Sequence, residues 1–275
     1  MKKLLLASCT VLSLGLCAPA ALAGDIGLAG STYDWSGGYV GLNAGAAFNT
    51  TKFRQNYTYA GQDVLDQDTL DLIDGLDSTA DAGDTGFTGG VLAGYNWQYA
   101  NFVIGAEADF NYLGFDNTVK NNVSDVMSQV LPPENTIASD KISYQTNSYG
   151  TLRARLGYAA NNVLIYGTGG LAYGKTKIKQ TLEAYDDAGD YATWKGQDEG
   201  WKAGWTLGGG IEYAQGRWVL GAEYLYVDLG TYDWGSKADV SLGDDTLNAD
   251  WGSVKEKGKA DVSINVARAT IKYRF

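Results

Sequence analysis

The stretch "FVIGAEADFNY", Phe102 to Tyr112, changes the character of its side chains at every step. Positions 102, 104, 106, 108, 110 and 112 are apolar or aromatic, whereas Gly105, Glu107, Asp109 and Asn111 lie between them. A period of two residues places these two sets on opposite faces of a β-strand. One face is apolar throughout and the other carries charge. The two faces are therefore expected to meet different environments, lipid on one side and a polar interior on the other.

The same alternation recurs along the chain. Each segment is long enough for a tilted strand that crosses a bilayer, which takes about 9–11 residues. The eight segments are 37–49, 86–97, 101–113, 145–158, 163–174, 203–214, 218–229 and 262–275. In them, large apolar and aromatic residues are expected to face lipid, and glycine, threonine and charged residues to face the lumen.

The connections between these segments fall into two length classes. The short ones are 98–100, 159–162 and 215–217, and the long ones are 50–85, 114–144, 175–202 and 230–261. Short periplasmic turns and long external loops are typical of outer-membrane barrels. The sequence therefore predicts an all-β fold, an eight-stranded antiparallel transmembrane β-barrel with short periplasmic turns and four long extracellular loops. Closure of the last strand on the first would leave no open edge.

The beginning of the sequence has the features of a secretory signal peptide. Lys2 and Lys3 precede an apolar stretch that ends in Ala21-Leu22-Ala23, a small-x-small cleavage site. We expect cleavage after Ala23. The predicted organisation is a signal peptide at 1–23, an N-terminal periplasmic segment at 24–36 and the barrel at 37–275, located in the cell outer membrane.

The composition excludes several classes of function. The chain has no histidine, and both cysteines, Cys9 and Cys17, fall in the predicted signal peptide. Without Lys2 and Lys3, 19 basic side chains face 32 acidic ones, a net charge of −13, which argues against nucleic-acid binding. Nucleophilic catalysis of the kind that uses histidine as general base lacks its proton acceptor. We therefore predict no enzymatic activity, no catalytic residue, no cofactor and no metal site.

Charged residues on the inward faces are the candidate site. They are Glu107, Asp109, Arg153, Arg155, Glu212, Glu223, Arg268 and Lys272. Two interpretations compete, a polar pathway for a solute or proton and an ion-paired plug. An eight-stranded barrel is just wide enough for side chains to fill, and buried charges persist mainly when they are paired. Both arguments favour the plug.

Several segments resemble the small porin-like outer-membrane proteins of alphaproteobacteria. The most specific are "GFTGGVLAGYNWQY" at 86–99, "FVIGAEADF" at 102–110, "WVLGAEYLYVDLG" at 218–230 and the closing "YRF". This family includes major surface antigens and a haemin-binding branch. The resemblance implies an eight-stranded monomeric barrel and recognition of Phe275, with Tyr273, by the barrel-assembly machinery as an assembly signal. Haemin binding usually calls for a histidine or tyrosine ligand, and no tyrosine here is singled out by a motif.

The expected function is that of a non-enzymatic outer-membrane barrel that contributes to envelope integrity and to surface presentation or adhesion. The alternatives are a narrow porin-like channel for small solutes and a surface protein that binds haemin or another ligand. The expected partners are outer-membrane lipid and lipopolysaccharide, the barrel-assembly machinery, and a host or envelope partner at the acidic loops. In the first long loop, Asp63, Asp66, Asp68, Asp71, Asp74, Asp77, Asp81 and Asp84 supply the acidity. The apolar residues at 64–76 predict a short amphipathic helix in the same loop.

Overall fold

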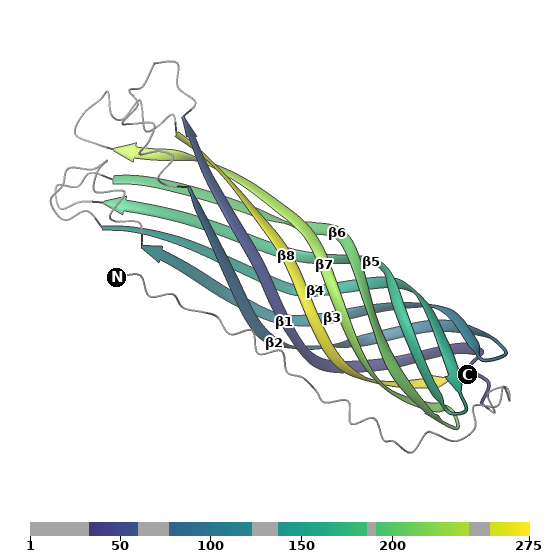
Figure 1. Cartoon of the computed structure of the whole chain (residues 1–275). Helices are drawn as coiled ribbons and strands as arrows, with labels where there is room; N and C mark the ends of the chain where they lie inside the picture. The colour runs from purple at the N-terminus through teal and green to yellow at the C-terminus, as the bar shows by residue number, and fades with distance from the viewer. Residues whose placement is uncertain (1–32, 60–76, 123–136, 186–190, 242–253) are drawn as a thin grey trace, which may run out of the picture. The chain divides into compact units, whose positions relative to one another are not determined.

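The structure, a computed structural model, describes residues 33–59, 77–122, 137–185, 191–241 and 254–275 (Figure 1). Eight strands occupy them: β1 (Gly37–Tyr59), β2 (Ser78–Tyr99), β3 (Phe102–Asn122), β4 (Ile137–Ala160), β5 (Val163–Tyr185), β6 (Tyr191–Gln215), β7 (Trp218–Ser241) and β8 (Val254–Arg274). Each strand pairs antiparallel with the next, and β1 also pairs with β8, so the sheet closes into a barrel. The eight-stranded antiparallel barrel predicted from the sequence is confirmed.

Three expectations fall outside the described residues. They are the signal peptide with Ala21 and Ala23, the helix within 64–76, and the aspartates at 63–74. The described residues contain no helix long and apolar enough to cross a membrane.

Two-residue turns join β2 to β3, β4 to β5 and β6 to β7, at one end of the barrel together with the C-terminus (Figure 1). The first residue of each turn has a positive φ: 53° at Ala100, 52° at Asn161 and 61° at Gly216. A positive φ at this position is what two-residue hairpin turns require, because their twist then matches that of the strands. The positions of the short connections were predicted from the sequence to within a residue or two.

The strands are 21–25 residues long and continue well past the expected ends into segments that were predicted to be loop. That prediction was wrong because, along strands such as β5, the apolar residues lie on the outward face near the short turns and on the inward face farther from them. On β5, Ile165, Leu171 and Tyr173 point outward, but beyond them Lys175 and Lys179 do. A search for outward apolar residues therefore stops near Tyr173, although the strand continues to Tyr185.

The lower part of the outer wall is an exposed apolar band between two girdles of aromatic side chains. Leu42, Ile104, Leu156, Ile165 and Leu220 are among its exposed residues. The girdle beside the short turns contains Trp97, Tyr99, Phe102, Tyr158, Tyr213, Trp218 and Tyr273, and the opposite girdle contains Phe87, Phe110, Tyr112, Tyr173, Trp201 and Trp205. On β5 the band covers 163–173, the length of about 9–11 residues that a tilted strand needs to cross a bilayer. An exposed apolar band of this height suits the hydrocarbon core of a bilayer. We call the part of the barrel between the two girdles the spanning barrel.

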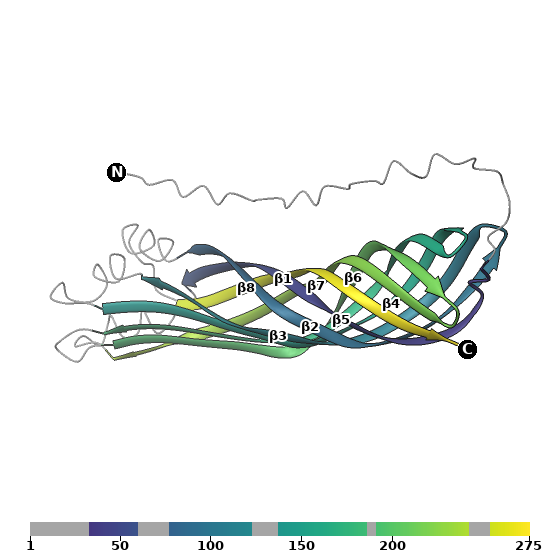
Figure 2. The same cartoon turned by 90° about the horizontal axis from the view of Figure 1, so that it is seen from below.

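Beyond the second girdle the strands continue as a curved sheet that we call the extension (Figures 1 and 2). The ladder between β2 and β3 ends at Thr88 and Leu113, so these two strands are not paired with each other in the extension. It comprises 50–59, 78–85, 114–122, 137–148, 175–185, 191–200, 228–241 and 254–263. Its inward face carries a buried apolar cluster that includes Phe53, Ile178, Leu229, Tyr232 and Trp234. The expectation that large apolar residues face lipid concerned the spanning segments only, and in the extension such residues line the interior together with polar ones such as Thr51 and Thr176. Outside the membrane, water surrounds the wall and the apolar face must turn inward.

Candidate functional site

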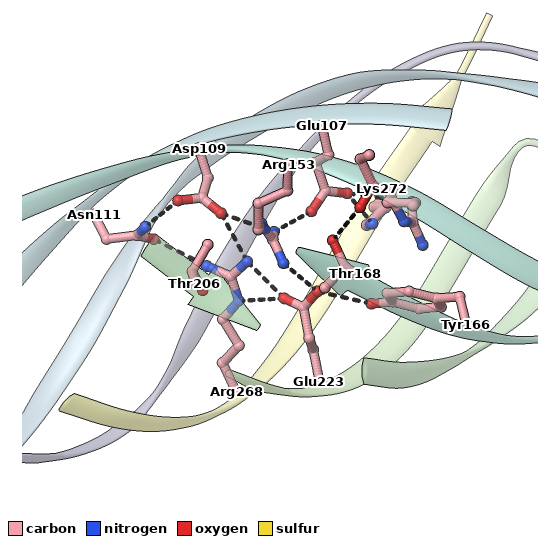
Figure 3. Close-up of polar contacts among 12 residues, drawn as sticks. Glu107, Asp109, Asn111, Arg153, Tyr166, Thr168, Thr206, Glu223, Arg268 and Lys272 are labelled. Atoms are coloured by element: carbon pink, nitrogen blue, oxygen red, sulfur yellow. Dashed lines mark hydrogen bonds and ion pairs between the residues drawn. The ribbon is translucent and has the colours of Figure 1, made fainter. Parts of the chain in front are cut away.

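The eight predicted lumen charges come from five strands: Glu107 and Asp109 from β3, Arg153 and Arg155 from β4, Glu212 from β6, Glu223 from β7, and Arg268 and Lys272 from β8. All eight point into the spanning barrel and are buried. Two pairs lie directly opposite each other in the sheet, Glu107 with Arg153 and Glu223 with Arg268. The structure brings all eight into one connected network, which we call the lumen network (Figure 3).

Arg153 lies at the centre of this network. Its guanidinium nitrogens lie 2.5 Å from Glu107 Oε1, 2.9 Å from Asp109 Oδ2 and 2.7 Å from Glu223 Oε1. Arg268 reaches the last two carboxylates from the opposite side, at 2.9 Å and 2.6 Å (Figure 3). Two planar guanidinium groups thus clamp two carboxylates, a geometry that a lysine could not reproduce.

Arg155 and Lys272 form the other half of the network. Arg155 Nη2 lies 2.5 Å from Glu212 Oε1, and its Nη1 lies 3.3 Å from Glu107 Oε2. Lys272 Nζ bridges the same two carboxylates at 2.8 Å and 2.6 Å. Glu107 therefore joins both halves, because it also binds Arg153.

The network is electrically balanced, with four carboxylates facing four basic groups. Nine ion pairs connect them, and no side chain in them is more than 2 % exposed. Charges removed from water are tolerated when opposite charges and hydrogen bonds surround them. The arrangement satisfies this condition and leaves no charge unpaired among the eight.

The prediction missed two tyrosines that complete the network. The Tyr39 hydroxyl accepts a hydrogen bond from Arg155 at 2.6 Å and donates one to Glu107 at 2.9 Å. Tyr166 donates to Glu223 at 3.0 Å, and the Arg155 guanidinium lies 3.9 Å from the centre of its ring. Residue type alone assigns both to the lipid face. Only strand parity could have found Tyr166, because it alternates with the outward Ile165.

A glycine makes room for one of these rings. A Cβ atom placed on Gly210 would lie 2.7 Å from the Tyr166 hydroxyl, closer than real contacts allow. Glycine at this inward position lets the aromatic ring cross the lumen and reach Glu223.

The lumen is also filled on both sides of the network. Toward the turns, Trp35 packs with Val103, Leu164 and Val219 in a buried cluster. The Trp35 backbone N–H donates to Gln98 Oε1 at 2.6 Å, so the residues before β1 are tied across the mouth of the barrel. On the other side, the network is followed by the apolar cluster of the extension.

A second buried polar group lies in the extension, outside the spanning barrel. Glu256 accepts hydrogen bonds from Ser236 at 2.5 Å and from Trp234 Nε1 at 3.0 Å, and Asp140 accepts one from Gln180 at 3.0 Å. No basic side chain of the described residues forms an ion pair with either carboxylate. Burial raises the pKa of both Glu256 and Asp140 above the ordinary range.

The predicted assembly residues lie at the end of β8. The Tyr273 ring lies 5.1 Å from that of Trp218 and 6.0 Å from that of Phe275. The Phe275 backbone N–H donates to Gly38 O at 3.1 Å, while its side chain is exposed. The chain end is therefore held in place and presents an aromatic ring. Recognition of this ring by the assembly machinery stays a prediction.

The part of the chain that the structure describes contains no cluster of three or more histidine, cysteine, aspartate or glutamate residues that could hold a metal ion.

The sequence is similar to known outer-membrane proteins. Residues 9–275 match the family model described as outer membrane protein beta-barrel domain. The 31 kDa outer-membrane immunogenic protein of Brucella melitensis is 41% identical over 203 residues, which cover 72% of this chain and 73% of that protein. The 22 kDa outer membrane protein of Rhizobium leguminosarum bv. viciae is 30% identical over 171 residues, 62% of this chain and 64% of that protein.

Among solved structures, the outer membrane protein OprG from Pseudomonas aeruginosa aligns with a TM-score of 0.40 and 12% identity, covering 88% of this chain and 98% of that one. The outer membrane protease OmpT from Escherichia coli aligns with a TM-score of 0.39 and 10% identity, covering 90% and 100%. Neither likeness is close enough to bear on what this chain does.

Proposed function

The chain belongs to the outer membrane protein beta-barrel domain family, and on this basis we propose that it is a closed, non-enzymatic barrel that supports envelope integrity and presents its extracellular connections at the cell surface. As a member of this family it is an outer-membrane protein. The proposal concerns what the barrel does there.

The single observation that carries the proposal is the filled lumen. The eight charged side chains of the lumen network form nine ion pairs with one another. Buried apolar clusters fill the lumen on both sides of this network. A conducting pathway needs polar groups that are free to exchange partners with a solute and with water. The lumen network offers such groups only if several ion pairs break together. This favours a plug over the alternative of a narrow channel.

Presentation at the surface is supported by the length of the extension. It carries the four connections away from the outer girdle on a wall of paired strands, 11 residues beyond Gly174 on β5. The first connection contains five aspartates between positions 63 and 74. An acidic surface held away from the membrane suits adhesion to a basic partner. Haemin binding remains an alternative that no described group of residues favours.

The test is complementation of a deletion strain. Loss of the gene should raise sensitivity to detergents and to large antibiotics that an intact outer membrane excludes. The full-length protein and a variant with the connections 60–76 and 242–253 shortened should both restore the barrier, because the barrel alone supplies it. Only the full-length protein should restore adhesion to a host-cell or matrix surface. Restoration of the barrier by neither form, in spite of normal surface levels, would contradict the proposal.

A further inference from the structure

Directly above the outer girdle, the outer wall of β4, β5 and β6 carries a regular array of basic side chains. We call it the lysine face. It consists of Lys141 on β4, Lys175, Lys177 and Lys179 on β5, and Lys195 on β6. The pairing register sets its geometry. Lys141, Thr181 and Lys195 form one row across the three strands, and Ser143, Lys179 and Gln197 form the next. Neighbouring strands are about 4.8 Å apart, so the lysines of adjacent rows lie within reach of one ligand.

The charge of this face is not balanced by the protein. On the outward face, Glu199 lies opposite Lys177 and binds both Lys175 at 3.0 Å and Lys177 at 2.8 Å, and the exposed Glu183 lies one outward position beyond Thr181. Lys141, Lys179 and Lys195 take part in none of the ion pairs found in the described ranges. Like charges on adjacent strands repel unless an anion lies between them. In a chain with a net charge of −11, five lysines beside two glutamates form a local excess of positive charge, which suits an external anion.

The height of the face relative to the bilayer identifies the kind of anion. Lys175 is the next outward position after Tyr173, and it lies directly opposite Trp201. Both aromatic residues belong to the girdle that marks the outer interface. The face therefore begins at the level of the lipid headgroups and rises through the layer above them, where basic side chains recognise anionic headgroups.

The foot of the lysine face is hollowed. A cavity of about 330 Å³ is lined by Tyr173, Trp201, Lys202 and Ala203. The Tyr173 and Trp201 rings lie 5.9 Å apart, and the Lys202 ammonium lies 3.7 Å from Asp198, a loose pair. The Lys202 ammonium also lies 5.3 Å from the centre of the buried Tyr232 ring, so it is turned toward the lumen. The exposed Tyr173 and Trp201 rings suit the packing of a sugar, and the outward lysines above them suit its phosphate. The exposed amide of Gln197, in the rows above, suits a sugar hydroxyl.

We propose that the lysine face binds the phosphate and sugar-acid groups of a glycolipid in the outer leaflet, whose acyl chains lie along the apolar band below. The lipid would anchor the extension to the surrounding leaflet at this side of the barrel. The proposal rests on the barrel's place in the outer membrane and not on whether its lumen conducts. Its failure and that of the proposed function are therefore distinguishable.

The test is a binding measurement on the refolded protein in nonionic detergent, with diphosphorylated lipid A as the probe. The variant K177Q/K179Q/K195Q should bind about tenfold more weakly or worse, because several headgroup contacts are lost together. The matched control K255Q/K257Q/K259Q removes the same charge from the outward face of β8 and should change affinity less than about twofold. The lysine-to-arginine triple at 177, 179 and 195 keeps the charge and should bind like the wild type.

Dephosphorylated lipid A separates headgroup recognition from capture by the apolar band. The wild type should bind it as weakly as the K177Q/K179Q/K195Q variant binds the phosphorylated form. Heat-modifiable migration on gels establishes that each variant is folded. Equal binding of both lipid forms by the wild type, or equal losses in the two glutamine triples, would overturn the proposal. If the K177Q/K179Q/K195Q variant does not fold, the single variant Lys179→Gln, which breaks no ion pair, replaces it. Its affinity for diphosphorylated lipid A is then compared with that of the wild type.

Discussion

At the scale of single residues, the lumen network depends most on Arg153, because it binds three of the four carboxylates. Arg153→Ala should lower the free energy of unfolding by about 3–5 kcal/mol, the usual effect of removing one partner of a buried pair. Glu107→Ala should have a similar effect. The double variant should cost less than the sum, because each change already disrupts their shared contact. Urea unfolding of the refolded protein in detergent measures all three.

The control for this double-mutant cycle of Arg153 and Glu107 is the exposed pair Lys177 and Glu199, whose side chains are 40% and 43% exposed. Exposed pairs contribute about 0–1 kcal/mol, so Lys177→Ala should change little. Strict additivity of Arg153→Ala and Glu107→Ala would contradict the proposed direct coupling.

A second residue-scale prediction concerns Glu256 in the extension. Burial raises its pKa, so the folded state holds this proton more tightly than the unfolded state does. The extension should therefore be most stable at acidic pH and should lose stability as the pH rises from the ordinary glutamate pKa to the raised one. Glu256→Gln keeps an uncharged hydrogen-bonding group and should reduce this loss. Unfolding midpoints at pH 4 and pH 8 measure the effect.

The exposed Asp233 supplies a matched control, since its side chain is 60% exposed. Asp233→Asn removes the same charge from the same extension without removing a buried carboxyl, and the pH dependence should persist in this variant. Asp140 lies in the same lumen and also has a raised pKa, so some pH dependence should remain in Glu256→Gln. A Glu256→Gln protein that loses as much stability as the wild type between the two pH values would exclude the buried carboxyl as the cause.

The sequence identified the charged residues of the network and missed its aromatic ones for a physical reason. A charged side chain on the inward face of a spanning strand is buried in a filled lumen, where an opposite charge from another strand stabilises it. The rule that aromatic residues face lipid puts Tyr39 and Tyr166 on the wrong face, because a phenol can also donate and accept hydrogen bonds in a polar lumen. Trp35 lies before β1, where no alternation is available to assign its direction.

At the scale of the strands, the main feature is that the apolar side chains change from the outward to the inward face along a strand. Ile165 and Leu171 face lipid from β5, whereas Ile178 and Leu182 fill the lumen from the same strand. The sequence located the spanning part of the strands because lipid selects apolar outward residues. It missed the extension because there the outward residues are polar, and a sequence pattern of this kind reads equally well as loop.

The strand prediction can be tested by hydrogen exchange. Backbone amides at 176–184 should be protected, because they pair with β4 on one side and with β6 on the other. Their protection factors should approach those of 164–172 in the spanning barrel and exceed those of exposed loops by orders of magnitude. Fast exchange throughout 176–184, together with protection of 164–172, would show that the extension is not a paired sheet.

Irregularities of pairing could not be predicted from the sequence. The register of β7 against β8 shifts between Asp228 and Thr231, where Gly230 has a φ of +77°. The register of β6 against β7 shifts between Trp194 and Trp205. Such bulges depend on the way neighbouring strands accommodate one another at the boundary between the spanning barrel and the extension, and not on local preferences.

At the scale of the whole molecule, assembly should depend on the chain end. Deletion of Phe275 should lower the amount of folded protein in the outer membrane without affecting refolding in detergent, because its ring is exposed and packs only on Tyr273 among the ring contacts found. Phe275→Tyr keeps an aromatic ring and should assemble normally. Gel migration of membrane fractions with and without heating measures the folded amount. Normal assembly of the deletion would exclude Phe275 as an assembly signal.

The proposed closure of the lumen by its own side chains is tested by single-channel recording of the refolded protein in a planar bilayer. With folding established by heat-modifiable migration, the wild type should leave the bilayer silent across a range of voltages. Steady, reproducible openings from the folded protein would contradict the proposed closure and show that the ion pairs of the lumen line a path.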